Sequence, residues 1–346
     1  MSVLQVILPG ECSKRLQHVL EYSLCGTRHI LRGAIDPAVD GPILFAASIY
    51  ASGMNASLCA LLHQLRTHPG LLNGRVCGVL IDGETELYTK SVGRDIVLAA
   101  NLCGCTFPGR PLVEGTGSLN NFSILARNAG ENTLQSYKNA ARELIERVMC
   151  YQKPSLQRPR LLVLHASNRE TSNTMALWSM VRRHIEKDID IQEITLRNGA
   201  VADCMGCAYT TCLHFSEAGN CFYGGVMVDE VYPALENSDA LMLLCPNYND
   251  AVSANISAFI NRLTSLFLKT RFYEKSLFGI VVSGYSGGDI VASQLISGLN
   301  MNKTFQLPPN FCMLETANDP GSILNCEGIE TRARVFAENM KHHLMV

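Results

Sequence analysis

Residues 241–263 read LMLLCPNYNDAVSANISAFINRL, an apolar run followed by a turn and a helical pattern. Residues 43–65, ILFAASIYASGMNASLCALLHQL, match this stretch without a gap, tyrosine on tyrosine and alanine on alanine. The next apolar runs also correspond, VCGVLIDG at 76–83 and LFGIVVSG at 277–284. Two unrelated α/β domains could share this periodicity, but the length of the ungapped match favours an internal duplication.

The second half alternates buried-strand and amphipathic-helix patterns. RLLVLHA at 160–166 is a continuous apolar run, as in a strand that is buried on both faces of a parallel sheet, and a helix is expected from about 173 to 186. Further strands and helices alternate to the end of the chain, which predicts a doubly wound parallel sheet of about five strands. The expected fold is therefore α/β, with two doubly wound sheets in tandem. The expected domains are residues 1–150 and 158–346, separated by the polar, proline-containing segment YQKPSLQ.

The composition and charge of the chain argue against several classes of protein. The chain has 346 residues, 47% of them hydrophobic, and a formal net charge of -2, which gives no charge surplus for nucleic acid or an anionic membrane. No apolar run approaches the ~20 residues of a membrane span, and the N-terminus lacks the basic start of a signal peptide. The fourteen cysteines then indicate thiols in a reducing cytoplasm rather than a secreted disulfide scaffold.

Three loops of the second half are expected to meet at one sheet edge. They are ASNRETSNT at 166–174, CPNYND at 245–250 and SGYSGGD at 283–289, and each follows a predicted strand. Ligands of doubly wound sheets bind outside the carboxyl ends of the strands. The first loop leads into a helix N-terminus, where free N–H groups and hydroxyls suit an anion. It could also be an ordinary helix cap formed by Ser172 or Asn173.

The first half lacks the counterparts of these features. Its first turn is a compact PGECSK at 9–14, and no segment corresponds to the cysteine-rich loop at 203–221. We therefore expect residues 1–150 to be a degenerate copy without cofactor loops, acting structurally as a built-in partner of the second half.

Residues 160–324 resemble the flavodoxin-like NAD(P)H-dependent FMN reductase superfamily, especially its iron–sulfur flavoprotein branch. Four motifs support this resemblance. They are the Ser-Asn-Arg loop with Ser-Asn-Thr at 172–174, the Pro-Asn-Tyr turn at 246–248, the helix that ends in SAFINR at 257–262, and the glycine-rich turn at 284–288. The resemblance implies two flavodoxin-like domains and an FMN held by these loops. Its implied phosphate ligands are Ser167, Arg169, Ser172, Asn173 and Thr174. Its implied flavin-ring contacts are Pro246, Asn247, Tyr248, Asn249, Ser283, Gly284, Tyr285, Gly287 and Gly288.

The loop at 203–221 concentrates Cys204, Cys207, Cys212 and Cys221. In the iron–sulfur branch a cysteine motif at this place binds a 4Fe–4S cluster. Its spacing resembles C-x₂-C-x₂-C-x₄₋₇-C, whereas this chain has C-x₂-C-x₄-C-x₈-C. Four thiolates also suit tetrahedral zinc, and related reductases carry such cysteines without a metal. All three possibilities stay open on the sequence.

The resemblance implies an FMN-dependent oxidoreductase that passes electrons from NAD(P)H or ferredoxin to a small-molecule acceptor. The alternative is an electron-transfer iron–sulfur flavoprotein that serves a redox protein and has no small-molecule substrate. Reductases of this family commonly pair subunits, so a homodimer is expected, with no role for nucleic acid or membrane.

Overall fold

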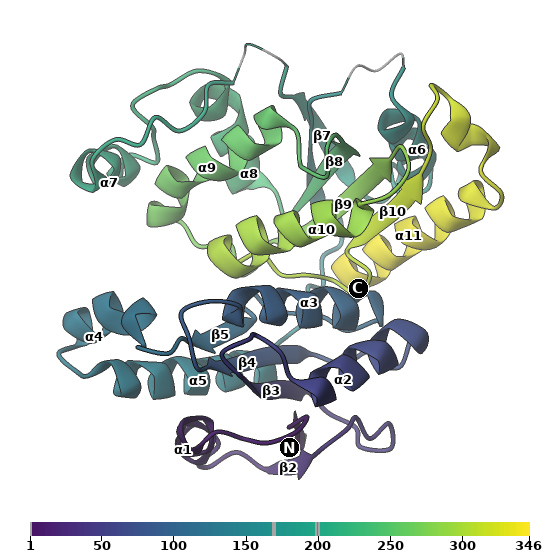
Figure 1. The fold of residues 1–346 in the computed structure, drawn as a ribbon. Coiled ribbons are helices and arrows are strands. Elements are labelled where there is room, and N and C mark those ends of the chain that lie inside the picture. Colours follow the sequence, from purple (N-terminus) through teal and green to yellow (C-terminus); the bar gives the residue numbers. More distant parts are fainter. Residues whose placement is uncertain (1, 168–170, 198, 200) are drawn as a thin grey trace. The chain divides into compact units, whose positions relative to one another are not determined.

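The computed structural model describes residues 2–167, 171–197, 199 and 201–346. The chain divides into two compact units, Met1–Gln152 and Lys153–Val346, each with its own sheet (Figure 1). None of the helices in the described part of the chain combines the length and the apolar character that a bilayer crossing needs.

The first unit contains a five-stranded sheet in the order β2-β1-β3-β4-β5, and every pair of neighbours is parallel. Its strands are β1 (Leu4–Ile7), β2 (His29–Arg32), β3 (Ile43–Ile49), β4 (Cys77–Gly83) and β5 (Leu112–Gly115). Its helices are α1 (Lys14–Ser23), α2 (Ala56–Thr67), α3 (Thr89–Leu102), the short 3₁₀ turn η1 (Asn120–Phe122), α4 (Ser123–Ala129) and α5 (Thr133–Met149).

The second unit repeats this topology, with a five-stranded parallel sheet in the order β10-β9-β8-β6-β7. Its strands are β6 (Arg160–His165), β7 (Asp190–Thr195), β8 (Ala240–Asn247), β9 (Ser276–Ser283) and β10 (Cys312–Thr316). Its helical elements are α6 (Asn173–Arg183), α7 (Tyr209–Glu217), η2 (Met227–Val231), α8 (Tyr232–Asn237), α9 (Ala254–Lys269), α10 (Gly288–Leu295), η3 (Ile296–Met301), η4 (Ser322–Asn325) and α11 (Ile329–Leu344).

Numbered within each unit, both sheets have the strand order 2-1-3-4-5, the doubly wound order of flavodoxin. The predicted fold class, two flavodoxin-like sheets in tandem, is therefore confirmed. A tandem duplication fits this topology. It also fits the start of α2 at Ala56 and of α9 at Ala254, two positions that the ungapped sequence match pairs.

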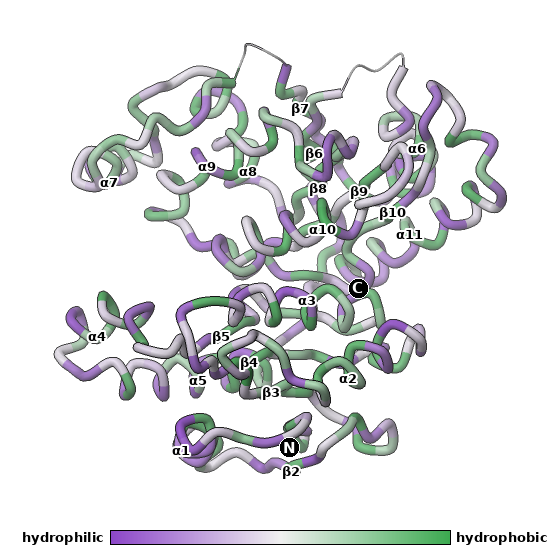
Figure 2. The backbone as a smooth tube through the Cα atoms, in the orientation of Figure 1, coloured by the Kyte–Doolittle hydropathy of each residue, from purple (hydrophilic) through white to green (hydrophobic). Residues whose placement is uncertain are grey.

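The central strands form the core of each unit because both of their faces are covered. In β8 the first six residues are buried, and in β4 all seven are buried. Figure 2 shows hydrophobic residues concentrated along these strands, whereas hydrophobic and hydrophilic residues alternate along the helices, as amphipathic helices require. Such strands can carry polar residues only near their ends, which is where the sites described below begin.

Two features of the second unit differ from the sequence expectation. The cysteine-rich segment contains a helix, α7, and the crossover from β7 to β8 contains η2 and α8. Met227, Val231, Tyr232 and Leu235 are buried along that crossover. Their spacing of three and four residues was the signal for a helix there.

Candidate functional site

Three adjacent strands of the second unit end at one edge of the sheet. β6 ends at His165, β8 at Asn247 and β9 at Ser283, and β8 lies between the other two. The loops that follow these strands are the three that the sequence singled out. The topology therefore brings them to one place, outside the carboxyl ends of the strands.

The first loop leads into the N-terminus of α6. Ser172 is the N-cap, and its side chain accepts a hydrogen bond from the backbone N–H of Met175 at 3.3 Å. Thr174 is buried in the first turn, so the loop and helix present backbone donors and hydroxyls together. Arg169, which the sequence predicts as a phosphate ligand, lies outside the described residues.

Ser167 is the feature of this loop that points to a ligand. Its hydroxyl oxygen is buried and has no hydrogen-bond partner among the described residues. A buried hydroxyl without a partner costs about 1–3 kcal/mol. Ser167 lies directly after β6 and shortly before the N-terminus of α6.

The side chain of Asn173 is hydrogen-bonded within the chain. Its side-chain amide donates to the carbonyl oxygens of Ala317 at 3.1 Å and Asp319 at 2.9 Å, and its Oδ1 accepts from the N–H of Ile323 at 3.4 Å. The side chain therefore fastens the loop after β10 to the start of α6. Toward an anion, Asn173 has its backbone N–H to offer.

Asn247 links the second loop, after β8, to the third loop, after β9, through hydrogen bonds. Its amide nitrogen donates to Ser283 Oγ at 3.1 Å, to the carbonyl oxygen of Ser286 at 2.8 Å and to Asp250 Oδ1 at 3.3 Å. Gln294 of α10 adds a bond to the carbonyl oxygen of Asp250 at 2.8 Å. The loops after β8 and β9 therefore form one fixed surface.

The backbone of this surface is specialised for close contact. Asn249 and Asp250 both adopt left-handed conformations, with φ of 54° and 55°. Gly287 has φ of 82°, and a Cβ built there would lie 1.9 Å from Asp250 Oδ1. Only glycine fits at this position, so the third loop can lie directly against the second.

Large exposed side chains stand on the same surface. Tyr248 is 63% exposed and Tyr285 is 82% exposed, one from each of the two loops that Asn247 links. Pro246 is half-buried at the end of β8. Cys245, one residue earlier, is buried, and burial raises its pKa to about 12, so it stays a protonated core thiol.

Two further polar atoms at this edge are buried, one on Asn247, which the sequence singled out, and one on Ser253, which it did not. Ser253 Oγ and Asn247 Oδ1 are buried and have no partner among the described residues. In the first unit the residue paired with Ser253 is Asn55, whose side chain caps α2 through the N–H groups of Ser57 and Leu58. The side chain of Asn55 therefore caps its helix, whereas the Ser253 hydroxyl has no partner among the described residues, and only the structure shows this difference.

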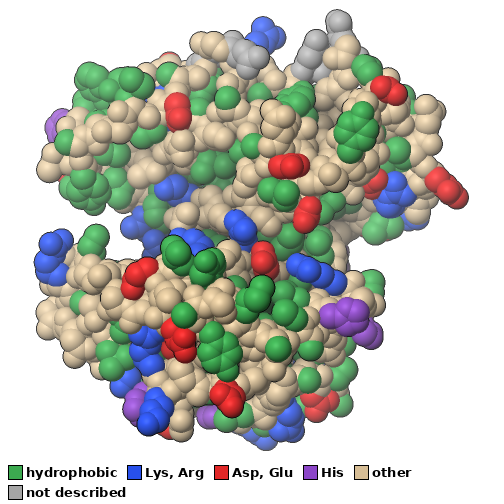
Figure 3. Space-filling view, viewed as in Figure 1, with side chains coloured by type: hydrophobic (Ala, Val, Ile, Leu, Met, Phe, Trp, Pro, Cys, Tyr) green, Lys and Arg blue, Asp and Glu red, His purple; other side chains and the backbone are tan. Residues whose placement is uncertain are grey.

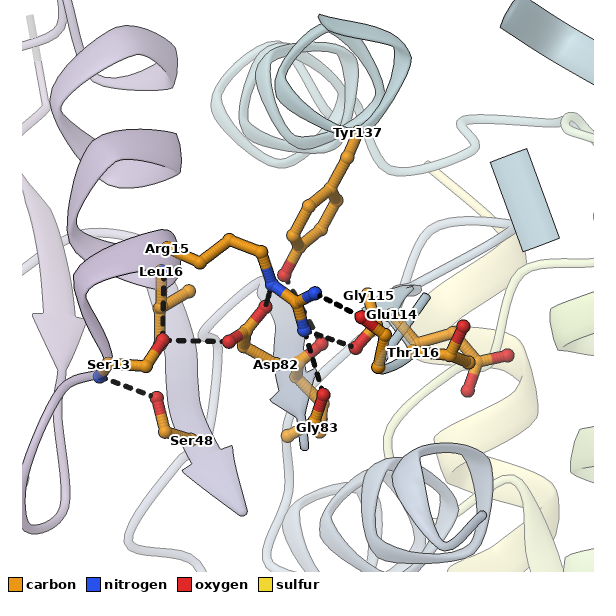
Figure 4. A network of polar contacts seen from close by, with 12 residues as sticks. Ser13, Arg15, Leu16, Ser48, Asp82, Gly83, Glu114, Gly115, Thr116 and Tyr137 are labelled. Carbon is orange, nitrogen blue, oxygen red and sulfur yellow. Dashed lines mark hydrogen bonds and ion pairs between the residues drawn. The ribbon is translucent and has the colours of Figure 1, made fainter. Parts of the chain in front are cut away.

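The same sheet edge in the first unit is filled by its own side chains (Figure 4). Arg15 of α1 donates from Nε to Asp82 Oδ1 at 2.7 Å, and its other nitrogens bond the carbonyl oxygens of Gly83 at 2.7 Å and Gly117 at 2.9 Å. Ser13 donates to Asp82 Oδ2 at 2.7 Å. Asp82 is 4% exposed, so the ion pair and its hydrogen bonds occupy the edge.

The cysteine loop of the second unit is fastened to α9. The buried Arg262 donates to the carbonyl oxygen of Ala202 at 3.5 Å and to that of Gly224 at 2.7 Å, near the two ends of the loop. Asn261 donates to Asp203 Oδ1 at 2.9 Å. The two polar residues that end the SAFINR segment therefore fix the loop in place.

The four cysteines of this loop are close enough to influence one another. Cys204 is exposed, and Cys207, Cys212 and Cys221 are half-buried. Burial, together with repulsion from the other three thiols, raises the pKa of Cys212, whereas Lys303 acts to lower it. Among the described residues, however, no group of three or more His, Cys, Asp or Glu side chains is arranged to hold a metal ion. The predicted metal site is therefore not confirmed.

The sequence of the second unit gives a family match. Residues 159–319 match the NADPH-dependent FMN reductase family. The match spans most of the second unit and includes all three edge loops and the cysteine loop. It supports assignment of the chain as a flavin-dependent oxidoreductase of the FMN reductase type, with FMN as its cofactor. A comparison with curated proteins finds no match.

Solved structures give weaker likenesses. An NAD(P)H:quinone oxidoreductase from Methanothermobacter marburgensis is 14% identical, with a TM-score of 0.42 over 54% of this chain and 98% of the other. An FMN-dependent NADH-azoreductase from Bacillus anthracis, in complex with FMN, is 9% identical, with a TM-score of 0.36 over 53% of this chain and 99% of the other. Likenesses at this level carry no argument about activity.

Proposed function

We propose that the second unit binds one FMN at the carboxyl edge of its sheet, and that the chain reduces a small-molecule acceptor with electrons from NAD(P)H. The observation that carries this proposal is the buried hydroxyl of Ser167 beside the N-terminus of α6, which has no hydrogen-bond partner in the described part of the chain. A phosphate monoester accepts hydrogen bonds on several oxygens, which matches a hydroxyl and free helix N–H groups in one loop.

The phosphate contacts we propose are the hydroxyls of Ser167, Ser172 and Thr174, the backbone N–H of Asn173, and the guanidinium of Arg169. The first loop lacks the G-x-G-x-x-G fingerprint of a dinucleotide site, which favours a mononucleotide over FAD. The unpartnered Ser253 hydroxyl joins this set as a donor that the sequence did not suggest.

The flavin ring is proposed to lie against the surface that the loops after β8 and β9 form, which Asn247 holds together by hydrogen bonds. Pro246, Asn247, Tyr248 and Asn249 of the second loop, with Ser283, Gly284, Tyr285, Gly287 and Gly288 of the third, are the proposed contacts. FMN, when bound, supplies the hydride- and electron-accepting chemistry. The chain fixes its orientation through this surface, and Asn247 Oδ1 offers an acceptor for a ring N–H. The exposed rings of Tyr248 and Tyr285 shield the site from water and contact the acceptor.

A 4Fe–4S cluster in the cysteine loop is the finer part of the proposal. Its support is the spacing of Cys204, Cys207, Cys212 and Cys221 and the tethering of both loop ends by Arg262. The described side chains do not form a ligand set, so the reaction is not routed through a metal. Anaerobic protein with close to four irons and four sulfides per chain, lost in Cys204→Ser/Cys207→Ser, would support the cluster; stoichiometric zinc or metal-free protein would refute it.

The second candidate function is electron transfer to or from a redox protein such as ferredoxin. It is favoured by the exposure of the cysteine loop, where Met205, Tyr209 and Phe222 are all more than 60% exposed. The two functions can occur together, because a carrier can supply the electrons that the flavin passes to a small acceptor.

The test of the proposed function is flavin content with turnover. The purified chain should show flavin absorbance, release FMN rather than FAD on denaturation, and oxidise NADPH only when an acceptor such as benzoquinone is added. Ser167→Ala/Thr174→Ala should lose the flavin and the activity together. A flavin-free chain, or a double variant that keeps both, would refute the proposal.

A further inference from the structure

An open groove lies between α1 and the edge strand β2 of the first unit. It has a volume of about 770 Å³, and its apolar lining includes Leu20 and Leu24 of α1, Leu31 of β2 and Leu8 after β1; it is here called the α1 groove. Sites for small molecules commonly measure about 300–1,000 Å³ and are mostly apolar. The α1 groove therefore has the size and the lining of a small-molecule site, and it shares no residue with the proposed flavin site.

The second unit covers the corresponding strand face with its own side chains. There Trp178 of α6 is buried, and its Nε1 donates to Glu193 Oε2 of β7 at 3.1 Å. Counted from the helix caps, the first unit has Val19 in place of Trp178. The strand registers place Leu31 where the second unit has Glu193. Because valine is much smaller than tryptophan, the face of β2 stays open, and Leu31 is 51% exposed.

The charged side chains of the α1 groove differ in whether they are already engaged. Arg28, just before β2, is exposed, and its guanidinium makes no hydrogen bond or ion pair with the described residues. Its neighbour His29 donates from Nδ1 to the carbonyl oxygen of Thr27 at 2.8 Å. On the α1 side, Glu21 accepts a hydrogen bond from Gln17 Nε2 at 3.0 Å. The group left to meet a ligand is therefore the cation on the β2 side.

We propose that the α1 groove binds a linear aliphatic carboxylate, with its chain against the four leucines and its carboxylate on Arg28. The lining positions on α1 run from Gln17 to Leu24, about 10 Å along the helix axis, which suits an extended chain. A guanidinium binds a carboxylate through two parallel hydrogen bonds, and each methylene buried against the leucines adds affinity. This binding belongs to the first unit and does not depend on the flavin.

A second copy of this chain is the alternative occupant, because β2 is an edge strand of its sheet. The charges of β2 oppose that pairing. Antiparallel pairing of two such strands about Ile30 would set like charges, Arg28 and Arg32, opposite one another. Figure 3 shows several Lys, Arg and His side chains along the lower border of the first unit, where Figure 1 places α1 and β2. Self-association is therefore an outcome of the test below.

The test is calorimetric titration of the full chain with octanoate, decanoate and dodecanoate, below the concentrations at which they form micelles. The affinity should rise roughly threefold to fourfold per added methylene. Leu31→Glu and Arg28→Gln should each weaken decanoate binding roughly tenfold, and Arg28→Gln should leave the weaker binding of decan-1-ol unchanged.

Two variants outside the groove are the matched controls. Arg32→Gln removes an exposed cation of the same strand, and Leu125→Glu changes a leucine of α4 that is 55% exposed. Neither residue lines the groove, so both variants should bind decanoate as the wild-type chain does. All four substitutions are at exposed positions, and thermal unfolding checks that each variant is folded.

Binding that strengthens with chain length and is weakened by both groove variants, with both controls unchanged, supports the proposal. Absent binding, equal affinity for all three chain lengths, or groove variants that bind like the wild-type chain overturn it. Decan-1-ol or decyltrimethylammonium that binds as tightly as decanoate also overturns it, because the cation then selects nothing. If Leu31→Glu shifts the oligomeric state in sedimentation and leaves decanoate binding intact, the groove belongs to a second copy and the proposal is wrong. Flavin content enters none of these outcomes.

Discussion

The two units have the same sheet topology but opposite chemistry at the carboxyl edge. In the first unit Arg15 and Asp82 meet at 2.7 Å, and hydrogen bonds from Ser13 and to Gly83 and Gly117 complete a closed network. In the second unit the hydroxyls of Ser167 and Ser253 at the same edge are buried and have no partner among the described residues. The polar side chains at the first edge pair with one another. The second edge is incomplete, because two of its buried hydroxyls have no partner among the described residues.

Aligning the N-cap residues of α1 and α6 allows the two sheet edges to be compared residue by residue. Ser13 caps α1 and Ser172 caps α6, each accepting from the N–H three residues later. Counted from the caps, Arg15 stands where the second unit has Thr174, and the matched strands place Asp82 where the second unit has Ser283. A charged pair therefore stands in the first unit at the positions that carry two hydroxyls in the second. We infer that the first unit replaced its ligand with an internal ion pair.

The largest effect should come from breaking that pair. Asp82→Ala leaves the Arg15 guanidinium, with only 25% of its side chain exposed, without its carboxylate, and should destabilise the first unit by about 3–5 kcal/mol. The counterpart Ser283→Ala removes one neutral hydrogen bond from Asn247 and should cost about 1 kcal/mol. Hydrogen exchange of the α1 and β4 amides in the full chain measures the first effect.

The double variant Arg15→Leu/Asp82→Leu is the matched control, since it removes both charges and should restore much of the loss. If Asp82→Ala costs less than about 1 kcal/mol, the ion pair does not hold the first unit's edge together.

A second contrast concerns pH. The buried histidines among the described residues, His165 and His343, belong to the second unit. Burial lowers the pKa of His343 to about 3, and its Nε2 lies 3.1 Å from Ser276 Oγ. The folded state keeps this ring neutral, whereas the unfolded state takes up a proton below about 6.5. The stability is complete above that pH and falls by up to about 1.4 kcal/mol per pH unit as the pH drops toward 3.

Hydrogen exchange between pH 7 and pH 5 should therefore show a steeper loss of protection in α11 and β9 than in the first unit's sheet. His343→Gln should lower the pH dependence of the free energy of unfolding by the uptake of about one proton. Equal slopes in the two units, or an unchanged slope in the variant, would contradict the assignment.

Much of this fold could be predicted from the sequence, because apolar runs of strand length such as 160–166 and 241–245 alternate with amphipathic helical patterns, which indicates buried parallel strands. The three edge loops followed from the same pattern, since turns after parallel strands share one side of the sheet. Arg15 could not be foreseen as an internal ligand, because its carboxylate lies 67 residues away and only the sheet order brings the two together. The fastening role of Asn173 was hidden for the same reason, as its partners lie more than 140 residues later.

The smallest of the contrasting effects concerns single hydroxyls. Ser167→Ala removes a buried donor that has no partner among the residues the structure describes, so the flavin-free unit should keep its stability while FMN affinity falls roughly tenfold. Ser48→Ala in the first unit removes the acceptor of the Ser13 N–H at 2.9 Å, so it should cost about 1 kcal/mol of stability and leave flavin binding unchanged. Calorimetric titration with FMN and thermal unfolding measure the two quantities. Identical behaviour of the two variants would remove the distinction between the edges.

The most direct test of the central claim, that only the incomplete edge takes a cofactor, is the flavin stoichiometry of the full chain. Native mass spectrometry, supported by phosphate analysis, should find one FMN per chain, and none in Ser167→Ala/Thr174→Ala. Two flavins per chain, or one flavin that survives this double variant, would contradict the account.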